Sequence, residues 1–355
     1  MWYLLFFVLT ALLAIAVTPL VRKLANNYGL VDVPRPPRNL HLYPVAKLGG
    51  VAIFVVVLVG IGVFWLSGGI DSAIVPPKFL WGIMLGALVL VIGGVIDDKY
   101  NLPAKYLWIA PVVAALIVVF SGIGVGIKFL SNPFGAPIDL NFMLLGLPAS
   151  GIFIFLWMLG MMFTTKFLDG LDGLVAGIGL IAGLTLFALS LSAQVNQPIT
   201  ATLAIILAGS LTGYLVYAFH PATIFLGEGG SLLIGFILGV LAVILGGKIA
   251  TALLVMGIPI LDVAWVIAQR LWYRKSPFLG DRLHLHFQLL DLGFSQKQTA
   301  AILYAISTAF GFTAVFLQSM GKAVALVVLF MLMAALILGV IYAYRRRQRI
   351  TRLTL

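Results

Sequence analysis

The sequence predicts an all-α polytopic membrane protein with about eleven transmembrane helices. Of its 355 residues, 62% are hydrophobic and only 9% are charged, and a soluble protein of this length could not bury so many apolar side chains. The apolar residues form segments close to the roughly 20 residues that a helix needs to cross a bilayer. Basic residues gather between alternate segments, as in multi-pass membrane proteins.

The first apolar segment, residues 2–20, has no basic region before it and is followed by Arg22 and Lys23. This pattern favours a retained helix with its N-terminus outside over a cleaved signal peptide. Because no internal repeat or soluble domain is apparent, one integral membrane domain over residues 1–355 is expected. Further spans are predicted near residues 48–67, 79–96, 106–123, 144–163, 174–193, 199–218, 230–247, 249–268, 299–318 and 323–343.

A small β-hairpin is predicted between the fourth and fifth spans. Residues 127–130 and 137–140 are short and mostly apolar, and the turn-forming run Asn132-Pro-Phe-Gly135 separates them. Two such segments around turn residues are typical of a hairpin. With the N-terminus outside, this hairpin is also expected outside.

The distribution of Lys and Arg predicts a cytoplasmic C-terminus. With eleven spans, five polar loops and the C-terminal tail lie inside, and they hold 18 of the 22 basic residues. This bias follows the positive-inside rule and explains the net charge of +11 without nucleic acid as a partner. The tail at 345–355 begins with three consecutive arginines, which favours a stop-transfer anchor over a specific binding site. The basic residues expected outside are Lys78, Lys128, Lys248 and Lys322.

The remaining ionisable residues collect at the same inner face. Only Asp262 lies well within a predicted span, whereas an ion or proton pathway would carry such groups at mid-membrane. Groups gathered at one surface suit a site that uses a water-soluble substrate and a lipid-borne one. The absence of cysteine excludes a thiolate nucleophile. The inner-face residues are Asp97, Asp98, Asp169, Asp172, Glu228, Asp281, Asp291, His41, His220, His284 and His286.

Two pairs of carboxylates are candidates for chemistry. Asp97 and Asp98 end the third span, where a divalent cation or a proton-accepting role would offset their repulsion; a solvated helix end is the alternative. Asp169 and Asp172 lie in Thr165-Lys-Phe-Leu-Asp-Gly-Leu-Asp-Gly-Leu174, where a helix would set both on one face. The alternative there is an acidic, glycine-rich cap of the next helix.

Two further segments carry polar groups suited to phosphate. Glu228 lies in Phe225-Leu-Gly-Glu-Gly-Gly-Ser231, where helix-start N–H groups suit phosphate and the carboxylate suits Mg²⁺. In the last loop, an extended segment would place His284 and His286 on one side, near Arg282. These three side chains could bind phosphate oxygens. A basic amphipathic loop resting on anionic lipid is the alternative.

Several ordered motifs between residues 29 and 300 together resemble one family. They are Gly29-Leu-Val-Asp-Val-Pro34, Arg38-Asn-Leu-His-Leu-Tyr-Pro-Val-Ala-Lys-Leu-Gly-Gly50, Asp97-Asp98, Asp169-Gly-Leu-Asp-Gly-Leu174, Pro259-Ile-Leu-Asp262 and Asp281-Arg-Leu-His-Leu-His286. In this topology the sequence resembles the polyprenyl-phosphate N-acetylhexosamine-1-phosphate transferases (glycosyltransferase family 4). That family includes the GlcNAc-1-phosphate transferases of O-antigen and teichoic-acid synthesis and, more distantly, the MurNAc-pentapeptide translocase.

The resemblance implies a transferase of the plasma (inner) membrane with its active site on the cytoplasmic face. Such an enzyme moves a sugar-1-phosphate from a UDP-sugar, here favoured as UDP-GlcNAc, to polyprenyl (undecaprenyl) phosphate and releases UMP. This is the first membrane step of cell-envelope glycan synthesis. Mg²⁺, with Mn²⁺ as an alternative, would offset the diphosphate charge and orient it for in-line displacement.

The resemblance also implies roles for individual residues. Asp97 and Asp98 would be catalytic and would serve the lipid phosphate and its deprotonation, and Glu228 and Asp98 would bind the metal. A groove near spans five and nine would take the polyprenyl chain. The implied substrate-binding residues are His41, Lys47, Lys105, Lys166, Asp169, Asp172, Arg282, His284 and His286.

Three positions depart from the family's usual pattern. Lys166 replaces an Asn, Glu228 replaces an Asp, and Phe287 replaces the last residue of a His-x-His-His motif. Glu still binds Mg²⁺ and Lys166 adds positive charge, so we favour an active, divergent branch. The alternatives are a lipid-linked sugar transporter or flippase, and a catalytically silent homologue that only binds lipid phosphate. The oligomeric state is open, with a homodimer among the options.

Overall fold

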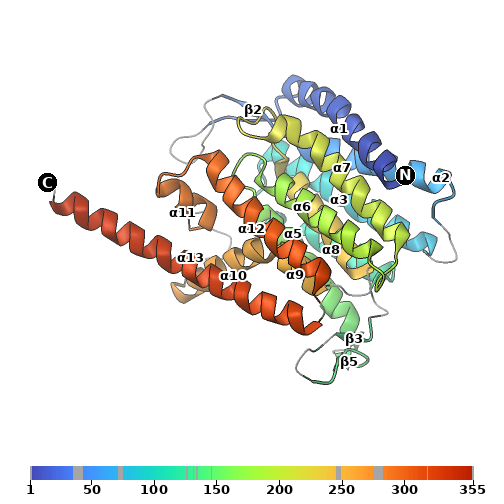
Figure 1. The fold of residues 1–355 in the computed structure, drawn as a ribbon. Coiled ribbons are helices and arrows are strands. Elements are labelled where there is room, and N and C mark those ends of the chain that lie inside the picture. Colours follow the sequence, from blue (N-terminus) through green and yellow to red (C-terminus); the bar gives the residue numbers. More distant parts are fainter. Residues whose placement is uncertain are drawn as a thin grey trace.

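The computed structural model describes residues 2–34, 43–70, 75–124, 127–130, 132, 135–144, 146–244, 249–274, 283–317 and 319–353. These residues form a helical bundle with three small two-stranded sheets (Figure 1). The helices are α1 (Trp2–Asn27), α2 (Gly49–Leu66), α3 (Pro77–Tyr100), the 3₁₀ helix η1 (Ala104–Tyr106), α4 (Ile109–Phe120), α5 (Ala149–Leu168), α6 (Leu174–Leu191), α7 (Pro198–Ala218), α8 (Gly227–Ile244), α9 (Ile249–Val255), α10 (Gly257–Trp272), α11 (Leu285–Asp291), α12 (Gln296–Phe316) and α13 (Ser319–Leu353).

The helices match the predicted spans in position. Within the described residues, nine helices are long and apolar enough to cross a membrane, and α9 with α10 forms a tenth candidate. The fourth predicted span, 106–123, contains the shorter apolar helix α4. The fifth, predicted to begin at residue 144, begins at Ala149. The chain is therefore a mostly helical, multi-pass membrane protein.

The ninth predicted span is broken. α9 and α10 meet at 79°, where a single helix over residues 249–268 was expected. Pro259 has no N–H to donate to the carbonyl of Val255, four residues earlier, so a straight helix would lose that hydrogen bond. The chain instead ends α9 at Val255 and begins α10 at Gly257, with Pro259 in the first turn of the new helix.

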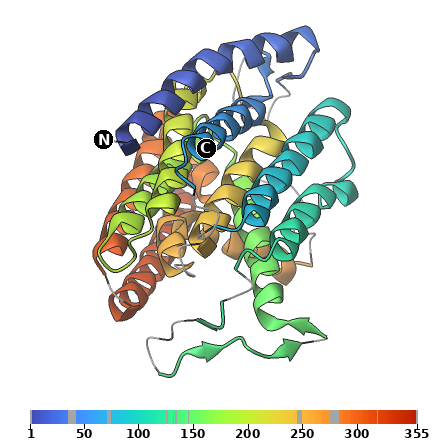
Figure 2. The same cartoon turned by 90° about the vertical axis from the view of Figure 1, so that its right-hand side faces the viewer.

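The predicted hairpin is present, and a second one follows it. β3 (Phe129–Leu130) pairs antiparallel with β4 (Ile138–Asp139), and β5 (Met143–Leu144) pairs with β6 (Leu147–Pro148). Both hairpins project from one end of the bundle (Figure 2). The second hairpin occupies the residues that the sequence assigned to the start of the fifth span.

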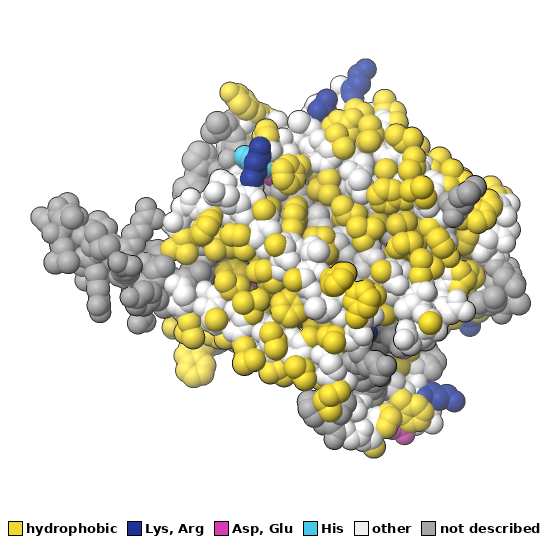
Figure 3. Space-filling view, viewed as in Figure 1, with side chains coloured by type: hydrophobic (Ala, Val, Ile, Leu, Met, Phe, Trp, Pro, Cys, Tyr) yellow, Lys and Arg dark blue, Asp and Glu magenta, His cyan; other side chains and the backbone are white. Residues whose placement is uncertain are grey.

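The surface agrees with a membrane environment. Hydrophobic side chains are spread over the whole face in Figure 3, and the few Lys and Arg side chains lie mainly toward its upper and lower edges. Many large apolar side chains are exposed, such as Leu4, Leu12 and Val216, at more than 60% each. Lipid tails rather than water would surround such positions, so their exposure needs no partner protein.

Small residues allow α1 to pack closely along α7. A Cβ atom on Gly213 would lie 2.2 Å from the carbonyl oxygen of Ala11, and one on Gly209 would lie 2.1 Å from Oγ1 of Thr10. Glycines four residues apart on one helix face let two backbones approach closely within a membrane. The Gly209–Gly213 face thus fixes how the first helix attaches to the bundle.

Replacing Gly213 with Leu should destabilise the protein, because the side chain would have to occupy space already filled by the backbone of α1. Overpacking of this kind costs about 1–3 kcal/mol. The matched control is Gly62→Leu in α2, where a Cβ atom has no neighbour within 4 Å. Unfolding temperatures in detergent, measured by gel filtration after heating, should fall for Gly213→Leu only. Equal temperatures for the two variants would contradict this packing.

Candidate active site

Three helices meet at the site with no side chains between their backbones. A Cβ atom on Gly94 of α3 would lie 2.1 Å from the backbone nitrogen of Gly229 at the start of α8. A Cβ atom on Gly50 of α2 would lie 2.3 Å from the Cα atom of Gly230. Only glycine permits such approach. The first turn of α8 is therefore wedged against both α2 and α3, one turn away from Asp97 and Asp98.

The segment before α2 runs beside the segment before α8. β1 (Val31–Asp32) pairs antiparallel with β2 (Val45–Ala46), and Ala46 forms a parallel bridge with Ile224. The backbone nitrogen of Gly49 then donates to the carbonyl oxygen of Phe225 at 2.9 Å. This pairing brings Lys47 and the first turn of α8 to the same place, although they are about 180 residues apart in sequence.

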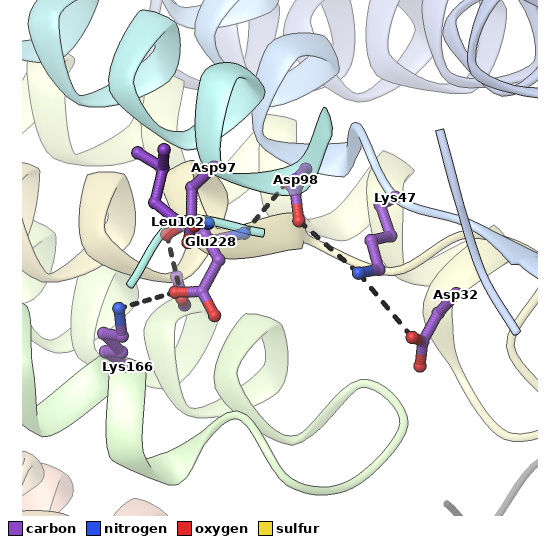
Figure 4. A network of polar contacts seen from close by, with 8 residues as sticks. Asp32, Lys47, Asp97, Asp98, Leu102, Lys166 and Glu228 are labelled. Atoms are coloured by element: carbon purple, nitrogen blue, oxygen red, sulfur yellow. Dashed lines mark hydrogen bonds and ion pairs between the residues drawn. The ribbon is translucent and has the colours of Figure 1, made fainter. Parts of the chain in front are cut away.

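Asp98 is held from two sides, as Figure 4 shows. Its Oδ2 accepts a hydrogen bond from the backbone N–H of Glu228 at 3.1 Å, and its Oδ1 lies 3.9 Å from Nζ of Lys47. The Lys47 ammonium also lies 3.6 Å from Oδ1 of Asp32. The donor N–H belongs to the first turn of α8, where such groups have no partner within the helix and favour a negative charge.

Asp97 and Asp98 do not form a solvated helix end. Asp97 is buried, and the side chain of Asp98 is only 4% exposed. Oδ1 of Asp97 accepts the backbone N–H of Leu102 at 2.8 Å, which turns the chain after α3 (Figure 4). The two carboxylates therefore have different surroundings. Asp98 faces Lys47 and α8, whereas Asp97 lines a cavity on the other side of α3.

Lys166 and Glu228 form a close ion pair at the site. Nζ of Lys166, in the last turn of α5, lies 2.6 Å from Oε2 of Glu228 (Figure 4). The side chain of Lys166 is 15% exposed and that of Glu228 is 38% exposed. Two of the three departures from the family pattern are thus direct partners. The lysine also balances the negative end of the α5 dipole.

The stretch from Asp169 to Gly173 is a turn between α5 and α6, so the predicted helix carrying Asp169 and Asp172 is wrong. α5 ends at Leu168, and Gly173 has a φ of +72°, which ends any continuous helix before α6. Glycine alone adopts this left-handed conformation without strain. The alternative of an acidic, glycine-rich connection is the one observed.

Asp169 keeps some solvent access, but its carboxyl group is crowded by protein atoms. Desolvation there, followed by the negative charges of Glu228 and Asp98, raises its pKa to about 8, against a weaker opposing hydrogen bond from Ser231. Burial of the carboxyl group is the larger cause of the raised pKa of Asp169, and the neighbouring carboxylates add to it. A cation bound nearby would lower the pKa of Asp169.

Asp172 holds a neighbouring turn. Its Oδ2 lies 2.6 Å from Nδ1 of His220 and accepts the backbone N–H of Ala222 at 3.1 Å. These contacts tie the α5–α6 turn to the connection between α7 and α8. His220 was grouped with the inner-face residues by sequence, but no motif marked it as a partner of Asp172.

Asp262 holds His284, one of the two motif histidines, in a similar way. It is buried, its Oδ2 lies 2.8 Å from Nδ1 of His284, and its Oδ1 accepts the backbone N–H of Leu285 at 2.8 Å. His284 precedes the short helix α11 and His286 lies in its first turn, so the segment is not extended as predicted. Their rings nevertheless stack, with centroids 5.7 Å apart.

A carboxylate on Nδ1 of a histidine fixes the ring's orientation and leaves Nε2 directed elsewhere. The ring of Phe167 also stacks on His284, with centroids 6.1 Å apart. A Cβ atom on Gly170 would lie 2.3 Å from Nε2 of His286, so that the Asp169–Gly173 turn and the histidines touch. The histidines thus lie beside Asp169.

A cavity of about 480 Å³ opens beside the Lys166–Glu228 ion pair. α3 and α4 form its walls, and Asp97, Lys166 and Glu228 lie in its lining. It lies between the third and fourth spans, whereas the sequence placed a groove near spans five and nine. α5 contributes Lys166 at its polar end.

Three predicted substrate-binding residues are not among these contacts. His41 and Arg282 lie outside the described residues. Lys105 is exposed on η1, and its Nζ lies 4.9 Å from the centroid of the Tyr106 ring. Across the part of the chain that the structure describes, no group of three or more His, Asp or Glu side chains is arranged to hold a metal ion.

Comparisons with known proteins give the family. Residues 80–246 match the model of glycosyl transferase family 4. A decaprenyl-phosphate N-acetylglucosaminephosphotransferase of Mycolicibacterium smegmatis is 30% identical over 321 residues, which cover 83% of this chain and 77% of that protein. The chain belongs to glycosyl transferase family 4.

Other family 4 members are similar over comparable lengths. A probable undecaprenyl-phosphate N-acetylglucosaminyl 1-phosphate transferase of Bacillus subtilis is 29% identical over 333 residues, or 92% of this chain and 88% of that protein. The undecaprenyl-phosphate alpha-N-acetylglucosaminyl 1-phosphate transferase of Escherichia coli K12 is 28% identical over 296 residues, or 79% and 75%. The similarity to these two relatives therefore extends over 92% and 79% of this chain.

Sequence reasoning missed two residues that organise this family 4 site. Asp262 was noted as the one acidic residue within a span, and that position was the available signal, because a buried carboxylate in a membrane helix needs a partner. Its partner His284 is 22 residues away, across the loop, and only the fold brings the two together. For His220 no comparable signal exists.

Proposed function

We propose that this chain transfers GlcNAc-1-phosphate from UDP-GlcNAc to a polyprenyl phosphate and releases UMP. The observation that carries the proposal is an apolar cavity that ends at Asp97, Lys166 and Glu228, beside Asp98, Asp169 and the stacked histidines. Such a junction suits an acceptor with an apolar chain and a phosphate, and a donor that arrives from water. The relatives are named as enzymes that transfer N-acetylglucosamine phosphate to undecaprenyl or decaprenyl phosphate.

The reaction breaks one phosphoanhydride bond. An oxygen of the lipid phosphate attacks the β-phosphorus of the UDP-sugar, and the bond from that phosphorus to the UMP oxygen breaks in line. Asp97 is the proposed proton acceptor, because it lines the cavity that would hold the lipid. Asp98 is the second proposed catalytic carboxylate. Its contacts with Lys47 and Glu228 hold it against the start of α8, so it would position the metal-binding end of that helix.

Glu228 and Asp98 are the proposed ligands of Mg²⁺, with Mn²⁺ as the alternative. The donor set fits, because both supply hard carboxylate oxygens, and the carboxylates of Asp98, Asp169 and Glu228 lie near enough to act on one another as like charges. Mg²⁺ commonly uses one or two protein carboxylates together with substrate phosphates, and therefore needs no three-residue protein cluster. When bound, the cation would neutralise charge on the diphosphate.

The nucleotide-sugar is proposed to bind across the Asp169–Gly173 turn and α11. Asp169 and Asp172 would form one side, and His284 and His286 the other, with His284 oriented by Asp262. Lys47 and Lys166 would contribute positive charge near the phosphates. His41, Lys105 and Arg282 remain proposed substrate-binding residues from the family motifs.

The proposed setting is the plasma (inner) membrane, with one transferase domain over residues 1–355 and the site on the cytoplasmic face. Purified protein with undecaprenyl phosphate and a panel of UDP-sugars should release UMP, most rapidly from UDP-GlcNAc. A transporter, a flippase or a silent lipid-binding homologue would release none.

Replacing Asp97 with Asn should lower UMP release about 10²-fold or more, because the amide keeps an oxygen for the Leu102 N–H but cannot accept a proton. Asp98→Asn should lower it on a similar scale through lost charge stabilisation. Because the carboxylates of Asp97 and Asp98 are largely buried, either substitution could disturb folding. The unfolding temperature of each variant is therefore the control. Near-normal turnover in correctly folded Asp97→Asn would remove Asp97 from the chemistry.

Glu228 and Lys166 should show coupled effects, because their charged groups lie 2.6 Å apart. Glu228→Gln should almost abolish turnover. Glu228→Asp should be impaired although it restores the family's usual residue, since its carboxylate is one carbon further from Lys166. Adding Lys166→Asn should recover part of the activity. UMP release is measured against Mg²⁺ concentration, and an unchanged Mg²⁺ dependence in Glu228→Gln would exclude Glu228 as a ligand.

The orientation can be tested because the native chain has no cysteine. Single cysteines are placed at Gly135, in the β3–β4 hairpin, and at Tyr100, the exposed last residue of α3. A membrane-impermeant maleimide should label Gly135→Cys in intact cells and Tyr100→Cys only after the membrane is opened. The opposite pattern would reverse the proposed topology.

A further inference from the structure

The turn between α5 and α6 has a hydrogen-bond partner on α12. Oη of Tyr304 donates to the carbonyl oxygen of Gly173 at 2.7 Å. The two residues are 131 apart in the sequence, and the packing of α12 along α6 brings them together (Figure 1). Tyr304 is half-buried and lies about two turns into α12. A residue far from every motif of the sequence thus reaches the turn that carries Asp169 and Asp172.

Gly177 makes room for the tyrosine ring. A Cβ atom on Gly177 would overlap both the ring and the hydroxyl group of Tyr304. The N–H of Gly177 donates to the same Gly173 carbonyl oxygen at 2.8 Å, as the first hydrogen bond of α6. A carbonyl oxygen has two lone pairs, and here one accepts from α6 and the other from α12. The two donors together hold the Gly173 peptide group in one orientation.

This turn needs a restraint from outside. Glycine has no Cβ atom to limit its dihedral angles, so Gly170 and Gly173 leave the backbone between α5 and α6 with several accessible conformations. The conformation observed is the one in which Asp172 contacts His220. A hydrogen bond from Tyr304 to Gly173, the residue after Asp172, favours that conformation over the others.

α12 also follows directly on α11, the helix of the motif histidines. Its first turn is fixed by a capping box, in which Oγ of Ser295 accepts the N–H of Gln298 at 3.3 Å and Oε1 of Gln298 accepts the N–H of Ser295 at 2.9 Å. His286 lies in the first turn of α11, just before this cap. The two sides of the proposed nucleotide-sugar site, the turn and α11, are therefore both connected to α12.

We propose that Tyr304 is a positioning residue for the nucleotide-sugar, whose hydroxyl group holds the Asp169–Gly173 turn in the conformation that the donor binds. This inference rests on the proposed function and adds a residue to its donor site. Without the hydrogen bond, only a fraction of the molecules would hold the turn in that conformation, and the apparent dissociation constant would rise by the inverse of that fraction. A bound donor holds the turn through its own contacts, so kcat should change little.

Kinetics of Tyr304→Phe provide the first test, because this change removes the hydroxyl group and keeps the ring against Gly177. The loss of one hydrogen bond between neutral groups corresponds to about two- to tenfold in an equilibrium constant. KM for UDP-GlcNAc should rise by about that factor, whereas kcat, KM for undecaprenyl phosphate and the unfolding temperature should keep their wild-type values.

The matched control is Tyr217→Phe. Oη of Tyr217 donates to the carbonyl oxygen of Ile15 at 3.0 Å, so this variant also loses a hydrogen bond between a tyrosine and a backbone carbonyl, but one between α7 and α1. All three kinetic values should stay at the wild-type level in the control. An unchanged KM for UDP-GlcNAc in Tyr304→Phe, an equal rise in Tyr217→Phe, or a parallel rise in both KM values would overturn the proposal.

Hydrogen–deuterium exchange tests the restraint without reference to turnover. Local opening of a turn exposes its amides to exchange with solvent. Peptides that cover residues 169–177 should therefore exchange several-fold faster in Tyr304→Phe than in the wild type or in Tyr217→Phe. Equal exchange in all three proteins would show that other contacts hold the turn, and would overturn the proposal.

The failure of this proposal and that of the proposed function are distinguishable. If the wild-type protein releases no UMP from any UDP-sugar, the proposed function fails, while hydrogen exchange still decides whether Tyr304 holds the turn. If the wild type is active and Tyr304→Phe keeps the wild-type KM for UDP-GlcNAc, the function stands and Tyr304 does not position the donor.

Discussion

The candidate site depends on the direct contact of backbones at the start of α8. Gly229 and Gly230 lie against Gly94 and Gly50 with no room for a Cβ atom between them. This contact sets the distance from α8 to α3, and so allows the N–H of Glu228 to reach Asp98. In a membrane, where apolar side chains gain little by leaving lipid, such small-residue contacts are a principal way to bring helices together.

Around this contact, charge is arranged in pairs. Lys47 lies near Asp98, and Lys166 lies against Glu228, so two of the four clustered carboxylates have a nearby ammonium. Asp169 has none in these pairs, and desolvation, followed by the negative charges of Glu228 and Asp98, raises its pKa. Positioning and electrostatic stabilisation, rather than covalent chemistry, dominate phosphoryl transfer. A site with a partly compensated negative charge is suited to binding a divalent cation together with phosphates.

Two carboxylate–histidine contacts connect this centre to neighbouring turns and helices. Asp172 with His220 ties the α5–α6 turn to the chain before α8, and Asp262 with His284 ties α10 to α11. The second depends on the break between α9 and α10, because α10 starts in a new direction after the 79° bend. A broken span is acceptable within a membrane protein where its free backbone groups are buried among other helices.

The sequence alone determined the class of the protein and the location of its helices. Apolar segments of bilayer length fix the spans, since lipid leaves backbone groups no partner outside a helix, and local motifs identified Asp97, Asp98, Asp169 and Glu228. Tertiary structure decided how these residues meet. The Lys166–Glu228 pair joins residues 62 apart in sequence, and the Asp262–His284 contact joins residues 22 apart. The cavity takes its lining from α3, α4, α5 and α8. Periodicity and spacing describe a single element at a time, so partners across elements follow only from packing.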